Sequence, residues 1–125
     1  MESENKKTVI LGASTNPSRF SFHAANRLNQ KGIDFVPVGL KKGAVAGKEI
    51  LDIREKPMIK DVHTITLYIN PKNQVPYYEY IQRLKPRRII FNPGTENEEL
   101  ARLARAHHIE TIHDCTLVML GRNLY

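Results

Sequence analysis

Small and hydroxyl-bearing residues gather near the start of the 125-residue chain, in the segment Gly12-Ala13-Ser14-Thr15-Asn16-Pro17-Ser18-Arg19. Gly12 permits a tight turn, the serines and the threonine offer hydroxyls, and a helix starting here would offer unpaired backbone N–H groups. Together these groups suit a phosphate or a pyrophosphate. An ordinary strand-to-helix turn with a serine cap and a proline near the helix start is the alternative, and the spacing leaves both open.

The segment differs from two familiar phosphate-binding patterns. The dinucleotide fingerprint requires glycine where this chain has Ser14 and Pro17, and a Walker loop requires a Gly-Lys-Ser/Thr ending that is missing here. Any phosphate site in this segment would therefore be of another kind.

A basic pair, Lys41 and Lys42, follows Val38-Gly39-Leu40. NAD-binding folds usually carry an acidic residue at this point, which binds the ribose hydroxyls. Two cations in its place would favour a phosphate on the adenosine ribose, and both NADP and coenzyme A carry one. Solvated loop lysines are the common alternative.

Two further segments end predicted strands with amide and hydroxyl groups: Asn70-Pro71-Lys72-Asn73 and Asn92-Pro93-Gly94-Thr95. Both are expected to cap the helices that follow. Thr95 and Glu98, three residues apart, predict a capping box at the start of one of these helices.

Short apolar strands alternating with helical patterns must position these segments. Strands are predicted at 7–11, 33–38, 62–69, 88–91 and 110–113, and a further short strand or turn is left open at 49–53. The first helix carries Phe20, Ala24, Ala25 and Leu28 on one face. The alternation predicts a Rossmann-like, doubly wound parallel sheet of about five strands in a three-layer α/β/α domain. The candidate segments would meet at the carboxyl ends of its strands.

Composition narrows the class of protein. The chain has 19 Lys+Arg against 13 Asp+Glu, so its formal net charge is +6, which suits an anionic partner such as nucleic acid or a phosphorylated small molecule. One cysteine, Cys115, excludes an internal disulfide framework. No apolar run approaches the ~20 residues needed to cross a bilayer. We expect a single cytoplasmic domain over residues 1–125, with a flexible N-terminus at 1–6 and no membrane partner.

Catalysis and metal binding have weak candidates. His113 and Cys115 are two apart on a predicted strand and would share a face, so a thiol with a histidine base is conceivable. A small buried cysteine is the preferred interpretation. No ligand spacing matches a closed metal site. We therefore predict no catalytic residue and no metal.

A basic cluster surrounds Pro86 and could meet the phosphates of a nucleic acid. It consists of Arg83, Lys85, Arg87 and Arg88. No DNA- or RNA-binding motif contains it, and the aromatic residues form no obvious stacking platform. A solvated helix-to-strand turn is the preferred interpretation.

Several motifs together resemble those of CoA-binding-domain proteins. Three segments resemble the N-terminal part of that family's sequences: Val9-Ile10-Leu11-Gly12-Ala13-Ser14, Asn16-Pro17-Ser18-Arg19-Phe20-Ser21 and Phe35-Val36-Pro37-Val38. Its small stand-alone members close with segments similar to Asn92-Pro93-Gly94-Thr95, Asn97-Glu98-Glu99 and Asp114-Cys115-Thr116-Leu117-Val118-Met119-Leu120. The resemblance runs from about Lys7 to Leu120 and extends to the nucleotide-binding domain of the succinyl-CoA ligase alpha subunit.

The resemblance implies a Rossmann-like protein that binds coenzyme A, or an acyl-CoA, by its ADP part. It would place the loop from Gly12 to Pro17 around the pyrophosphate, Lys41 near the ribose phosphate, and Ile69, Asn70 and Pro71 on the adenine side. Many members have Asn-Pro where this chain has Gly39-Leu40. The candidate cofactor-binding residues are Gly12, Ala13, Ser14, Thr15, Asn16, Pro17, Arg19, Gly39, Lys41, Lys42, Ile69, Asn70, Pro71, Asn92 and Gly94.

The sequence therefore predicts a small cytoplasmic CoA-binding protein without catalytic machinery of its own. An NADP-type dinucleotide-binding protein, enzyme or sensor, is the alternative. A nucleic-acid-binding protein is the third and least favoured hypothesis.

Overall fold

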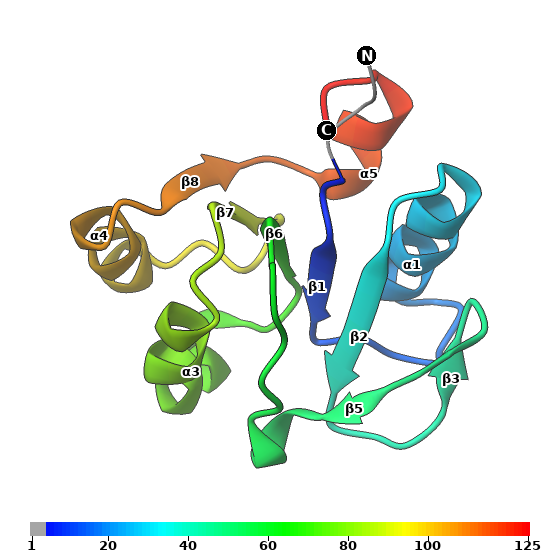
Figure 1. Cartoon of the computed structure of the whole chain (residues 1–125), viewed down its shortest axis with the longest axis horizontal. Coiled ribbons are helices and arrows are strands. Elements are labelled where there is room, and N and C mark those ends of the chain that lie inside the picture. The colour runs from blue at the N-terminus through cyan, green and yellow to red at the C-terminus, as the bar shows by residue number, and fades with distance from the viewer. Residues whose placement is uncertain (1–4) are drawn as a thin grey trace.

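Six parallel strands form the central sheet of the computed structural model, in the order β5-β2-β1-β6-β7-β8 (Figure 1). The structure describes residues 5–125, so most of the segment predicted to be flexible, 1–6, lies outside the described residues. The strands are β1 Thr8–Leu11, β2 Phe35–Gly39, β5 Leu51–Asp52, β6 Thr64–Leu67, β7 Arg88–Phe91 and β8 Glu110–His113. A separate antiparallel hairpin pairs β3 Ala44–Val45 with β4 Lys48–Glu49.

Helices connect the strands and cover the sheet. The α-helices are α1 Phe20–Gln30, α2 Pro71–Gln74, α3 Tyr78–Arg83, α4 Glu98–Ala106 and α5 Thr116–Gly121, and the 3-10 helices are η1 Ile53–Glu55 and η2 Val75–Tyr77. Within residues 5–125, no helix has both the length and the apolar character needed to cross a membrane.

The predicted Rossmann-like parallel sheet is confirmed, with six strands in place of about five. The additional strand is the two-residue β5, within the segment left open at 49–53, and it pairs with the end of β2. Numbered by their order along the chain, the sheet strands run 3-2-1-4-5-6, the order of dinucleotide-binding domains. The order reverses between β1 and β6, which is where such folds open a crevice.

The strand register brings the following loops to one edge of the sheet. Leu11 at the end of β1 lies level with Val38 and Leu67, and Leu67 lies level with Phe91. The loops after β1, β2, β6 and β7 therefore start side by side.

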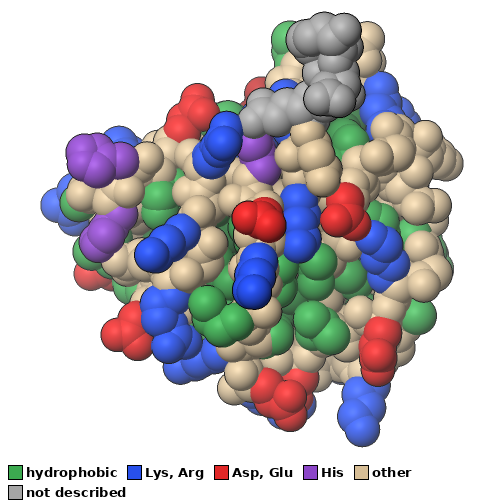
Figure 2. All heavy atoms as spheres, in the orientation of Figure 1, with side chains coloured by type: hydrophobic (Ala, Val, Ile, Leu, Met, Phe, Trp, Pro, Cys, Tyr) green, Lys and Arg blue, Asp and Glu red, His purple; other side chains and the backbone are tan. Residues whose placement is uncertain are grey.

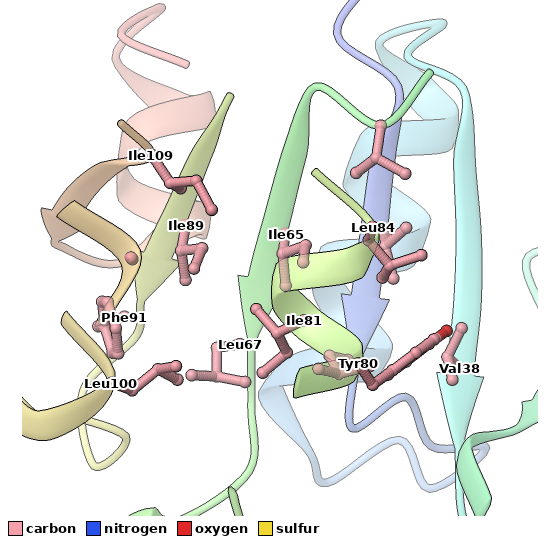
Figure 3. Packing of buried hydrophobic residues seen from close by; sticks show 14 of the residues in the cluster. Val38, Ile65, Leu67, Tyr80, Ile81, Leu84, Ile89, Phe91, Leu100 and Ile109 are labelled. Atoms are coloured by element: carbon pink, nitrogen blue, oxygen red, sulfur yellow. The ribbon is translucent and has the colours of Figure 1, made fainter. Parts of the chain in front are cut away.

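The two faces of the sheet carry separate apolar clusters, because alternate residues of a strand point to opposite faces. Val9 and Leu11 belong to the cluster under α3 and α4, which Figure 3 shows with Tyr80, Ile81 and Leu100. Ile10 belongs to the cluster under α1 and α5. These two packed faces make the predicted three-layer arrangement (Figure 1).

Two local predictions were wrong. Phe20 is 71% exposed, and Ser21 takes the buried position at the start of α1. Helix α4 is capped by Asn97, whose Oδ1 accepts hydrogen bonds from the backbone N–H groups of Glu99 and Leu100, and not by the predicted capping box. The hydroxyl of Thr95 instead donates to the carbonyl of Asn92 at 2.7 Å.

Candidate functional site

A cleft of about 900 Å³ lies at the carboxyl ends of the strands. Its lining comes mainly from the loops that follow β1, β2, β6 and β7, together with the first turn of α1 and parts of η1, α2 and η2. A concave site of this size, at the point where the strand order reverses, is where doubly wound folds bind small molecules.

Most of the residues predicted for the site line this one cleft. They are Gly12, Ala13, Ser14, Thr15, Asn16, Arg19, Gly39, Lys41, Ile69, Asn70 and Gly94. Four predicted residues are not part of its lining: Pro17, Lys42, Pro71 and Asn92.

Asn92 is buried and supports the fold; it does not lie on the cleft surface. Its side chain is 2% exposed, and its Nδ2 donates to the hydroxyl of Thr66 at 2.8 Å and to the carbonyl of Leu67 at 2.9 Å. Its Oδ1 accepts from the backbone N–H of Thr116 at 2.9 Å. Asn92 therefore ties the end of β7 to β6 and to the start of α5.

The loop after β1 is ordered by its own polar side chains. The Oγ of Ser14 accepts from the backbone N–H of Asn16, and the Oδ1 of Asn16 accepts from the backbone N–H and the hydroxyl of Ser18. Arg19 stands at the N-cap of α1 and makes no side-chain capping bond. Phe20 and Ser21, whose N–H groups open the helix, line the cleft. The positive end of α1 thus faces the cleft.

The charge of the cleft is positive. Arg19, Lys41 and Lys72 are among its lining residues, which within the described part of the chain include no Asp, Glu, His or Cys. Because opposing carboxylates are missing from these walls, the cleft attracts anions.

The two lysines after β2 have different surroundings. Lys41 lines the cleft, whereas Lys42 does not. A hydrogen bond from Arg54 holds the pKa of Asp52 below its ordinary value, and the nearby charge of Lys42 adds to this effect.

Glycines at the ends of β1 and β2 let neighbouring backbone segments pack closely beside the cleft. A Cβ at Gly12, where φ is +103°, would lie 3.0 Å from the carbonyl carbon of Tyr68. A Cβ at Gly39 would overlap the carbonyl oxygen of Ala13. Both contacts are with backbone, which cannot rotate away, so each position requires glycine.

Several lining residues were missed by sequence reasoning. Lys72 lay inside a segment that was singled out, and its charge was the signal that could have found it. Tyr68 was hidden inside the predicted strand 62–69, although β6 ends one residue before it. Its hydroxyl is buried without a hydrogen-bond partner, and burial raises its pKa to about 12. Ser18, Asn73, Pro93 and Thr95 also lay inside segments that were singled out in the sequence, and the remaining missed residues are Phe20, Ser21, Leu40, Ile53, Pro76 and Tyr77.

The histidine and cysteine considered for catalysis lie outside this cleft lining. The ring of His113 stacks on Phe91 with centroids 4.9 Å apart. Cys115 is half-buried and its backbone N–H donates to Asp114. Within residues 5–125, no group of three or more His, Cys, Asp or Glu side chains is placed to hold a metal ion.

In the basic cluster around Pro86, Arg88 is buried, whereas Arg83, Lys85 and Arg87 are exposed. Arg88 is 7% exposed, its Nε donates to the hydroxyl of Thr64, and its guanidinium stacks over the ring of Tyr125. On the face drawn in Figure 2, Lys and Arg side chains are scattered among Asp and Glu.

The strand order and the cleft define the chain as a Rossmann-like α/β protein. A family model described as a CoA binding domain matches residues 6–121, and the chain belongs to this family, as its motifs indicated.

Solved structures share the fold. A crystal structure of an uncharacterized protein is 51% identical, with a TM-score of 0.94, and the match covers 98% of this chain and 100% of that one. A hypothetical protein from Pyrococcus horikoshii OT3 is 24% identical over 97% and 85% of the two chains, with a TM-score of 0.82. A conserved hypothetical protein from Pyrococcus furiosus is 25% identical over 90% and 97%, with a TM-score of 0.77. No curated protein matched the chain.

Proposed function

We propose that the cleft binds coenzyme A, or an acyl-CoA, through its ADP part. The observation that carries this proposal is the charge of the cleft: Arg19, Lys41 and Lys72 line it, and its described lining contains no carboxylate. Coenzyme A has a pyrophosphate and a ribose phosphate, so it presents anions at separate points to such a surface. Membership of the CoA binding domain family supports this ligand over other polyanions.

In this arrangement the two phosphate-bearing parts of the ligand contact different loops of the cleft. The pyrophosphate lies against the loop that precedes α1, with the N-terminal N–H groups of the helix beside it. Lys41, after β2, pairs with the ribose phosphate. The proposed role is ligand binding, and no catalytic step is assigned to it.

NADP is the second candidate ligand. The 3-2-1-4-5-6 strand order favours a dinucleotide, and Lys41 stands near the point where NAD-binding domains carry an acid. NADP shares with coenzyme A a pyrophosphate and a phosphate on the adenosine ribose, so the charge of the cleft suits both.

Calorimetric titration with coenzyme A, 3′-dephospho-coenzyme A and NADP tests the proposal. Lys41→Ala is expected to weaken coenzyme A binding by about ten- to a hundredfold, because a charge-assisted contact with a phosphate is lost. The same variant should bind the dephospho form within about twofold of the unmodified protein. Lys42→Ala is the matched control, because Lys42 is outside the cleft lining, and it should bind both ligands normally.

Other outcomes would contradict parts of the proposal. Equal losses for coenzyme A and its dephospho form in Lys41→Ala would show general attraction without a specific phosphate contact. Tighter binding of NADP than of coenzyme A would favour the second candidate. Binding of neither, with salt-dependent binding of an oligonucleotide, would favour a nucleic-acid partner.

A further inference from the structure

A fully buried glutamine lies behind the part of the cleft formed by the loops after β6 and β7. Gln74, the last residue of α2, has 0% of its surface exposed. Its Nε2 donates to the carbonyl of Ile69 at 2.7 Å and to the carbonyl of Thr95 at 2.9 Å. Ile69 and Thr95 both line the cleft, whereas Gln74 does not.

The orientation of this amide is fixed by a second one. The Nδ2 of Asn97 donates to the Oε1 of Gln74 and to the hydroxyl of Tyr78, both at 2.8 Å. The Oδ1 of Asn97 caps α4. Each hydrogen of the two amide groups has an acceptor, so reversing the Gln74 amide would place its oxygen against two carbonyls and its N–H groups against another donor.

Asn92 joins the ends of the two strands, β6 and β7, through its bonds to Thr66 and Leu67, and Gln74 joins the loops beyond them. Within the segment after β7, the backbone N–H and hydroxyl of Thr95 donate to Asn92, and the backbone N–H of Gly94 donates to Glu96. Gln74 joins the carbonyl of Ile69 in one loop to the carbonyl of Thr95 in the other. The spacing of this part of the cleft therefore depends on its side chain.

We propose that Gln74 is a positioning residue that sets the loop after β7 for the pantetheine arm of the ligand. This inference rests on the proposed function. If the pyrophosphate lies beside β1 and the ribose phosphate beside Lys41, the arm extends toward Pro93, Gly94 and Thr95, which line the cleft beyond β6. In this arrangement Ile69 and Asn70 face the arm and not the adenine, which differs from what the resemblance implies. Gln74 acts through the loop after β7 and does not touch the ligand.

The test compares two ligands by calorimetry: coenzyme A, which has the arm, and adenosine 3′-phosphate 5′-diphosphate, which keeps all three phosphates and lacks the arm. Gln74→Met keeps the length of the side chain and removes its hydrogen bonds. We expect it to weaken coenzyme A binding by about tenfold while binding of adenosine 3′-phosphate 5′-diphosphate stays within about twofold. Gln82→Met is the matched control, since the side-chain amide of Gln82 donates to the carbonyl of Tyr78 within α3 and Gln82 lies outside the cleft lining.

A second variant keeps the test valid if Gln74→Met fails to fold. Asn97→Asp retains the oxygen that caps α4 and removes the donor that orients Gln74, so it should lower coenzyme A affinity with the same selectivity. Equal losses for both ligands, or unchanged coenzyme A binding in both folded variants, would overturn the inference. Failure of the unmodified protein to bind coenzyme A would instead overturn the proposed function itself.

Discussion

Gly39 stands where the second strand comes closest to the loop that opens the cleft. A Cβ there would overlap the carbonyl oxygen of Ala13. We expect Gly39→Ala to lower the free energy of unfolding by roughly 1–3 kcal/mol, because the backbone of two neighbouring segments must separate. Urea unfolding measures the change.

Gly121 provides the control for that substitution. It ends α5, and a Cβ placed on it would meet no atom within 4 Å. Gly121→Ala should raise stability by up to about 1 kcal/mol, since alanine favours a helix over glycine. Equal destabilisation by both substitutions would show that overlap with Ala13 is not the cause.

The residue types of the cleft were more predictable than the residues that support it. Gly12, Ser14 and Lys41 could be found because each follows a strand that reads clearly in the sequence. Gln74 could not, because a glutamine in a helical pattern is an ordinary surface residue. Its side chain bonds to two carbonyls, one of Ile69 in its own loop and one of Thr95 in the loop after the next strand of the sheet, and the local sequence does not show the second.

At the scale of elements, one side chain joins β6, β7 and α5. Asn92 was predicted to bind a cofactor, yet its bonds go to Thr66, Leu67 and Thr116. We expect Asn92→Ala to lower the free energy of unfolding by about 1–3 kcal/mol, since buried partners lose their bonds. Coenzyme A affinity of the folded variant should change by no more than about threefold. A large loss of coenzyme A affinity with an unchanged free energy of unfolding would show that Asn92 contributes to binding, against this expectation.

Strands β1, β2 and β7 were predicted well because their residues are mostly apolar and a glycine or proline ends or closely follows each of them. Helix starts were predicted less well. Thr95 and Glu98 match a capping box, but Asn97 lies between them and is itself a strong N-cap residue. The hydroxyl of Thr95 is occupied by the carbonyl of Asn92, and the carboxylate of Glu98 pairs with Arg105. The choice among competing caps depends on contacts that the local sequence does not contain.

At the scale of the whole molecule, the parallel sheet followed from the alternation of strands and helices. The two-residue β5 was left open because so short a strand is decided by its pairing with β2, through Val38 and Gly39, which its own two residues do not show. The same level register that ends β1, β2, β6 and β7 together also explains why most of the predicted cofactor residues meet in one cleft. The sheet topology brings these residues together, whereas their spacing along the chain could only indicate that each follows a strand.

Within residues 5–125 the cleft lining contains no histidine, the side chain whose ordinary pKa falls between about pH 5 and 8, and no carboxylate or thiol. Any proton linked to binding in that range must then come from the ligand or from groups outside the lining. The ribose phosphate of coenzyme A takes up its second proton near pH 6, by analogy with other phosphate monoesters. We expect coenzyme A affinity to weaken as the pH falls from 7.5 to about 5.5, while 3′-dephospho-coenzyme A affinity stays level. Parallel titrations of both ligands across this range measure the difference, and a matching decline for both would place the proton on the protein.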